Sequence, residues 1–169
     1  YIYFSSDRTA PGFPRGNVNS KVYQMALNKY EKPFKLDKFK GLFEDKKKDK
    51  KDNKDKKESK KEKVKVKINP NGLMNRLTAI SPRFGRQGSA SIIVDGNKTH
   101  IMYVTNHHEG KSQLWKTTLE PFENNKTVQV SKKTTFGYQL VSIKKKHYIL
   151  VRGVINTLNI GANKLKAIS

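Results

Sequence analysis

Two adjacent histidines, His107 and His108, followed by Glu109, are the residues of this chain whose types best suit metal binding. Neighbouring residues of a strand point to opposite faces, so two such imidazoles cannot both face one ion from a strand. No third ligand follows at a spacing typical of metal sites. We therefore interpret the pair as part of a surface turn, and we expect no metal and no other cofactor.

A serine nucleophile with a histidine and an acid is the second chemistry to consider. The chain has no Gly-x-Ser-x-Gly elbow, and the stretch 88–91 (Gly-Ser-Ala-Ser) leads into a predicted strand, where an elbow would lead into a helix. His100 and His147 hold equivalent positions of a repeat, which favours a packing role for both. The sequence therefore predicts no catalytic residue in this chain, and it leaves open whether the whole protein is an enzyme.

Four charged residues lie in predicted turns. Arg83 and Arg86 belong to the loop Pro82–Gly88, just before a predicted strand, and such a loop can face the channel of a closed all-β ring. Our hypothesis is that these two arginines steer acidic peptides. Asp7 and Arg8 are predicted to be structural, because Asp accepts N–H bonds within turns and Arg can pack on or pair with a neighbouring strand.

The elements that position these residues are short strands, which recur about every 8–12 residues and are separated by turn signals. Strict alternation at 64–68 predicts a strand with one buried face. Asp95-Gly96-Asn97 predicts a hairpin turn of the primed type, and Asn71-Gly72 and the lysines at 144–146 predict further turns. The predicted strands are Tyr1–Ser6, Lys21–Leu27, Val64–Ile68, Met74–Ile80, Ala90–Val94, His100–Thr105, Gln113–Thr118, Thr127–Val130, Gly137–Ile143, His147–Arg152, Val154–Ile160 and Lys164–Ile168.

Charge is concentrated in one segment. The chain has a formal charge of +22 over 169 residues, and Glu44–Lys67 alone holds 13 lysines against 7 acids. The frequent Asp and the missing apolar stripe favour a solvated, disordered insert over a single charged helix. The interspersed acids weaken attraction to polyanions, so nucleic acid is disfavoured as a partner.

An internal repeat indicates the fold. Ala90–Thr105 and Tyr138–Arg152 each read as strand, polar turn and strand, and His100 and His147 lie 47 residues apart, close to the period of propeller blades. Tyr1–Arg8 matches the second half of an earlier copy. We predict an all-β, incomplete β-propeller of about two and a half four-stranded antiparallel blades with a disordered Lys-rich insert. The expected domains are a partial blade at 1–43, the insert at 44–63, blade strands at 64–133, and a further blade with the start of a linker at 134–169.

Several motifs resemble tricorn-type serine peptidases, and the likeness covers nearly the whole chain. Ser6-Asp7-Arg8 after a strand, a Lys-rich insert, and Val66-Lys67-Ile68-Asn69 followed by Gly72, Leu73 and Arg76 are similar to that family, with Asn69 in place of its usual Asp. The residues from 136 to 152 resemble the blade before the family's catalytic half, and those from 163 to 168 resemble the linker out of the propeller.

The resemblance implies a parent protein with β-propeller modules and a downstream peptidase half, so that this chain channels or filters peptides and supports assembly. Its implied partners are peptide substrates and the remaining domains of the parent, and a homo-oligomer is also compatible. A free-standing β module that binds polyanions or a protein is the alternative function. The sequence contains no cysteine and no apolar run that spans a membrane, and it leaves the cytoplasm and the bacterial periplasm or cell envelope as equal candidates for localisation.

Overall fold

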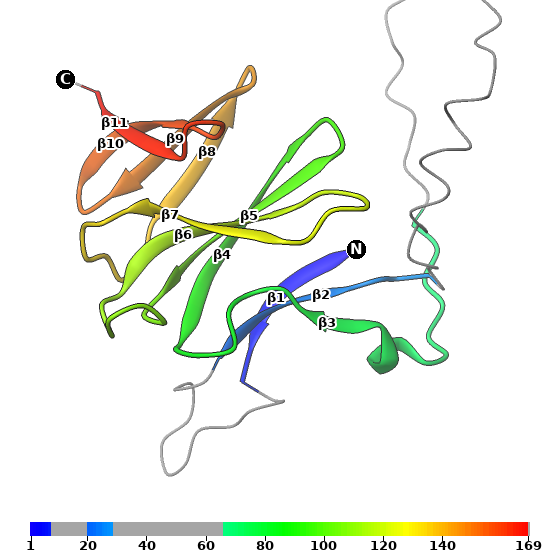
Figure 1. Cartoon of the computed structure of the whole chain (residues 1–169). Helices are drawn as coiled ribbons and strands as arrows, with labels where there is room; N and C mark the ends of the chain where they lie inside the picture. The colour runs from blue at the N-terminus through cyan, green and yellow to red at the C-terminus, as the bar shows by residue number, and fades with distance from the viewer. Residues whose placement is uncertain (8–19, 29–65, 169) are drawn as a thin grey trace, which may run out of the picture.

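The computed structural model describes residues 1–7, 20–28 and 66–168, and they form three antiparallel sheets (Figure 1). The described helical structure is a single 3-10 turn, η1, at Leu73–Arg76. An all-β fold, as the sequence predicts, is therefore confirmed.

Each sheet is built from strands that follow one another along the chain. The first sheet has the order β1-β2-β3, with β1 at Ile2–Ser6, β2 at Lys21–Met25 and β3 at Leu77–Ala79. The second sheet contains β4 (Gln87–Asp95), β5 (Lys98–Thr105), β6 (Gln113–Leu119) and β7 (Lys126–Ser131). The third contains β8 (Gln139–Ile143), β9 (Lys146–Val151), β10 (Val154–Asn159) and β11 (Lys164–Ala167).

The second sheet lies between the other two and buries both of its faces. Side chains alternate across a strand, so Ile101 and Tyr103 of β5 face the first sheet while Met102 and Val104 face the third. A strand that is buried on both sides needs an unbroken apolar run, which is what β5 supplies.

Two apolar clusters hold the three sheets together. The first cluster joins the first and second sheets through Val22, Ile80, Ile101 and Tyr103. The second cluster joins the second and third sheets and is formed by Ile93, Met102, Val104, Leu114, Val130, Ile149, Val151 and Leu158. Figure 1 shows the resulting arrangement, in which the sheets succeed one another from the N-terminal to the C-terminal end of the chain.

Most predicted strands agree with the structure, but two do not. Val66 and Ile68 are unpaired and 64% and 61% exposed, so the predicted buried strand at Val64–Ile68 is wrong for its described residues. Alternation stabilises a strand only where a neighbouring strand completes the ladder. Here the described backbone contact is a single bond from the Asn69 N–H to the carbonyl of Leu27, which lies beyond the end of β2. The predicted strand Met74–Ile80 is partly wrong, because its first half is the 3-10 turn η1.

The first sheet takes strands from both sides of the lysine-rich sequence. β2 pairs with β3, with Tyr23 opposite Ala79 and Met25 opposite Leu77. The charged segment therefore separates two neighbouring strands of one sheet. The predictions of a disordered insert at 44–63 and of a structural role for Arg8 fall outside the described residues.

The predicted hairpin turn at Gly96 and the predicted turn at Gly72 form where the sequence places them. Gly96 has a φ of 58° between β4 and β5, and Gly72 has a φ of 67° before η1. Glycine adopts this left-handed region without a Cβ clash, which explains both positions. The predicted closing strand is β11, which pairs with β10.

Candidate functional site

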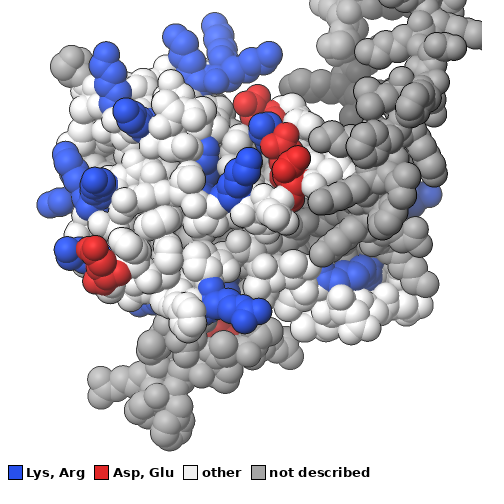
Figure 2. All heavy atoms as spheres, in the orientation of Figure 1, with Lys and Arg blue, Asp and Glu red and all other residues white. Residues whose placement is uncertain are grey.

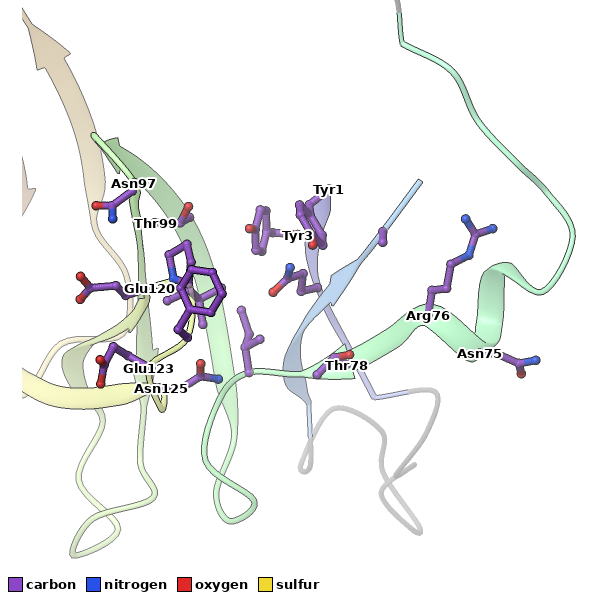
Figure 3. A pocket seen from close by; sticks show the side chains of 16 residues that line it. Tyr1, Tyr3, Asn75, Arg76, Thr78, Asn97, Thr99, Glu120, Glu123 and Asn125 are labelled. Carbon is purple, nitrogen blue, oxygen red and sulfur yellow. The ribbon is translucent and has the colours of Figure 1, made fainter. Parts of the chain in front are cut away.

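A cleft of about 690 Å³ lies between the first and second sheets (Figure 3). One wall comes from the start of β1, the end of β2 and the segment around β3. The other wall comes from the β4–β5 turn and the connection between β6 and β7. Its size falls in the range of sites that bind small molecules or peptide segments.

Two tyrosines, Tyr1 just before β1 and Tyr3 within it, stand in the middle of this cleft, between the strand with Thr99 and the segment with Thr78 (Figure 3). Residues two apart share a strand face, so Tyr1 and Tyr3 point the same way. Their ring centroids are 6.3 Å apart and the planes are tilted by 36°. Tyr1 is 52% exposed.

Tyr3 is the better-anchored ring of the pair. It packs against the cluster between the first and second sheets and makes a side-chain hydrogen bond with Thr99. Burial raises the pKa of the Tyr3 phenol above its ordinary value, and the bond with Thr99 opposes that shift. The phenol is therefore a neutral donor and acceptor at physiological pH.

The opposite wall carries an aromatic ring and two carboxylates. Phe122 lines the cleft with a φ of 69°, a conformation that is strained for a residue with a bulky side chain. Glu120 and Glu123 lie on either side of it in the sequence, and Glu120 pairs with Lys98 at 3.0 Å. Lys98 therefore offsets the charge of Glu120 at this rim.

Arg76, the arginine of the motif that resembles the peptidase family, supports one wall of the cleft through hydrogen bonds to backbone carbonyls. Its Nε donates to the carbonyl of Gly72 at 3.4 Å, and its Nη2 donates to the carbonyls of Asn69 and Asn71. Figure 3 shows its guanidinium turned away from the tyrosines. This arginine therefore stabilises the 69–72 turn that leads into β3.

The two arginines that the sequence predicts to steer peptides, Arg83 and Arg86, do not line this cleft. Both Arg83 and Arg86 are exposed. Arg86 lines a polar hollow of about 300 Å³ together with Asp7 and three serines (Ser5, Ser6 and Ser20), whereas Arg83 does not line it. The structure thus brings together Arg86 and Asp7, two residues that sequence analysis considered for different roles.

Beside this hollow, a buried glutamine joins the first two sheets. Gln87 is fully buried, its backbone carbonyl accepts a bond of 2.7 Å from the Ser20 hydroxyl, and its Oε1 accepts one of 2.9 Å from Ser81. Its Nε2 donates to the carbonyl of Phe84 at 2.7 Å. The bond with Ser20 joins segments that are distant in the sequence, and the bonds with Ser81 and Phe84 are local. Together they hold the loop that contains both arginines next to the start of β2.

The adjacent histidines lie in a turn after β5, as predicted. The His107 ring packs edge-on against Trp115 at 4.3 Å, and His108 pairs with Glu109 at 3.5 Å. In the part of the chain that the structure describes, no group of three or more potential ligands could hold a metal ion. His100 bonds the Thr118 hydroxyl at 2.9 Å, and His147 bonds the Ser142 hydroxyl at 2.7 Å, which agrees with a packing role.

Comparison with known proteins identifies no relative of this chain. No family model matches the chain, and no curated protein and no solved structure matches it. Within residues 1–7, 20–28 and 66–168, no helix is long and apolar enough to cross a membrane.

Sequence reasoning missed the cleft because its walls come from distant segments. Tyr1 was assigned to a strand and the stretch 121–125 to a plain connection. The alternation of Tyr1 and Tyr3 on one face was the available signal, but nothing local places that face opposite Phe122.

Proposed function

We propose that this chain forms consecutive blades of a β-propeller and serves as the non-catalytic, peptide-handling part of a tricorn-like serine peptidase. The observation that carries the proposal is the repetition of one architecture: three antiparallel sheets, each with its strands in chain order and each packed face to face on the next. Blades of a propeller have this organisation. The first sheet has three described strands where the other two have four, which suits a blade completed by a further strand.

The peptidase context rests on the motifs. The Ser6-Asp7-Arg8 sequence begins at the last residue of β1, and the lysine-rich segment separates β2 from β3 in the sequence. Arg76 stabilises the turn at Asn69–Gly72 through hydrogen bonds to its carbonyls. These features support a position next to a catalytic half that lies outside this chain.

The test of this function uses the full-length protein that contains the chain. We expect it to hydrolyse peptides, and we expect the double variant Arg83→Glu, Arg86→Glu to raise KM for acidic peptides while kcat stays the same. The variant Lys132→Glu, Lys133→Glu, which changes the same charge on another connection, is the control. Absence of peptide hydrolysis would overturn the peptidase context, and an unchanged KM would overturn the role of the arginines.

Binding of polyanions is the second candidate function, and the observation in its favour is charge. The chain carries +22, and lysine and arginine side chains are spread over the surface in Figure 2. Binding to heparin that weakens steeply with salt, and that is lost when residues 45–63 are deleted, would support it. Binding that survives the deletion would move the site to the three sheets, and no binding would end this alternative.

A further inference from the structure

We propose that the outer face of the third sheet docks a protein segment that presents an apolar stripe flanked by aspartate or glutamate side chains. The outer face is the side of β8–β11 that points away from the second sheet (Figure 1). This inference goes beyond the proposed function, because it assigns a partner surface that requires neither the two arginines nor a peptidase half.

The strand registers define which side chains lie on this face. Ile149, Val151 and Leu158 pack toward the second sheet. Side chains alternate across a strand, so Leu150 points outward, and Ile155, its partner in the register of β9 and β10, points the same way. The apolar side chains of the outer face are 38–54% exposed and are Val141, Ile143, Leu150, Ile155 and Ile168.

The interface between the second and third sheets shows how such a face is used in this molecule. On the second sheet, Met102 and Val104 pack toward the third sheet. Lys116 lies opposite Met102 on the same face, is 4% exposed, and donates from Nζ to the carbonyl of Ile160 at 2.6 Å. A face of apolar and lysine side chains thus docks on a neighbour that supplies apolar groups and an oxygen acceptor. The outer face of the third sheet combines the same two kinds of side chain.

Charge selects the partner for this face. Residues 124–169 contain nine lysines and arginines and no aspartate or glutamate. Lys146 and Lys166 lie on the outer face, and Lys144 and Lys145 form the turn at one end of it. Within the described ranges, no ion pair engages any of these four lysines. Carboxylates that complement them therefore have to come from the partner.

The turn of the β8–β9 hairpin holds two of these lysines in a strained conformation. Lys144 and Lys145 have φ of 46° and 66°, in a turn that favours Asn-Gly. Strained backbone of this kind gathers at ligand-binding positions, where the side chain has a use that offsets the strain. Contact of both ammonium groups with an acidic partner supplies that use.

Aliphatic side chains favour a protein over nucleic acid as the occupant. Bases bind to protein surfaces by stacking on aromatic rings. The exposed apolar side chains of the outer face are all aliphatic, and Tyr148 on the same face is half-buried. A second copy of the chain brings the same lysines to the interface, so charge repulsion confines that association to high concentration.

The test measures binding of a labelled amphipathic helical peptide to the purified 169-residue chain, at a dilution where sedimentation shows a monomer. The peptide has about 18 residues, with leucines on one face and glutamates on the other. We expect saturable binding that weakens at least about tenfold in the double variant Leu150→Thr, Ile155→Thr. The matched control is Ile92→Thr, Val94→Thr, which makes the same kind of change at exposed positions of β4 and should leave binding unchanged.

The charge is tested with a variant that keeps the fold. Lys144→Asn with Lys145→Gly relieves the strained turn, so a loss of binding in this variant does not reflect unfolding. We expect binding to weaken by about three- to tenfold, and the wild-type affinity to fall as salt is added. Lys132→Gln with Lys133→Gln removes the same charge from the connection before β8 and should change binding by less than about twofold.

Two further peptides separate the apolar and the ionic contributions. Equal binding of a peptide with the same residues in scrambled order would show that no apolar stripe is recognised. Equal binding of a peptide with lysine in place of glutamate would show that charge does not select the partner. Either result, no binding at all, or tighter binding to phosphatidylserine vesicles than to the acidic peptide would overturn the inference.

Discussion

Gln87 shows how a single polar side chain can decide the packing of two sheets. It is fully buried, and its amide contacts residues of the 81–86 loop while its backbone carbonyl accepts a hydrogen bond from Ser20, the residue just before β2. A polar side chain in such a place stabilises the fold only when all its partners are present, because a buried group left without a partner loses its hydration without compensation.

We therefore expect Gln87→Ala to lower the free energy of unfolding by about 2–3 kcal/mol. The variant leaves the Ser81 hydroxyl and the Phe84 carbonyl without their partner at the junction of the sheets. Urea denaturation followed by circular dichroism measures the change. Gln139→Ala, at an exposed position of β8, is the control and should cost less than about 0.5 kcal/mol.

The lowered pKa of His100 makes the free energy of unfolding depend on pH. Burial lowers the pKa of its imidazole from the ordinary value of 6.5; Lys116, Lys98 and His147 lower it further, while Asp95 opposes the shift. Between the lowered pKa and 6.5, the unfolded chain therefore binds more protons than the folded chain. The contribution of His100 to stability is fully present above about pH 6.5 and is lost as the pH falls through this window.

The measurement compares wild type with His100→Gln by urea denaturation at about pH 7.5 and about pH 5. The variant should lose less stability on acidification than wild type. Gln139→Ala, which changes an exposed residue and removes no titrating group, serves as the control and should keep the wild-type pH dependence. An identical loss in wild type and His100→Gln would show that the buried imidazole does not control the pH response.

At the scale of the element, the hairpin between β8 and β9 is held in an unfavourable turn. Its two connecting residues, Lys144 and Lys145, both have positive φ, at 46° and 66°. A two-residue turn of this kind suits the twist of the strands, but it favours Asn-Gly over two residues with long side chains. Three neighbouring lysines also repel one another there.

Lys144→Asn with Lys145→Gly should therefore stabilise the chain by about 1 kcal/mol, since the new residues adopt the same φ with less strain. Thermal denaturation provides the readout. The same change at Lys132 and Lys133, which are not among the residues with positive φ, is the control and should give no gain. A gain at both sites would mean that the loss of charge, not the turn, is responsible.

At the scale of the molecule, the third sheet differs from the other two sheets in the exposure of apolar side chains on its outer face. Val141, Ile143, Leu150, Ile155 and Ile168 are all 38–54% exposed, although the equivalent face of each preceding sheet is covered by the next one. Exposed apolar patches on sheets promote association.

We expect the chain to self-associate with rising concentration through this face, and Ile155→Lys to suppress the association. Sedimentation velocity measures it. Phe136→Lys, which places the same charge at an isolated exposed ring, is the control and should leave association unchanged. If the two variants behave alike, the outer face of the third sheet is not the interface.

Much of the architecture was predictable because it depends on local pattern. The strands β4 to β11 agree closely with the alternation and turn signals, as at Asp95-Gly96-Asn97, since a strand and its hairpin partner lie next to each other in the chain. The same reasoning failed at Val66 and Ile68, where alternation is present but no neighbouring strand pairs with it. Local pattern predicts a strand only if its pairing is local too.

The sequence by itself determined the all-β class, the repeat and the positions of most turns. Only the tertiary structure decided that β3 pairs with β2 across the lysine-rich segment, that Gln87 is buried between two sheets, and that Tyr1 faces Phe122 across a cleft. Each of these features joins residues far apart in the chain. Their contacts depend on which faces of the sheets pack together, and no short stretch of sequence carries that information.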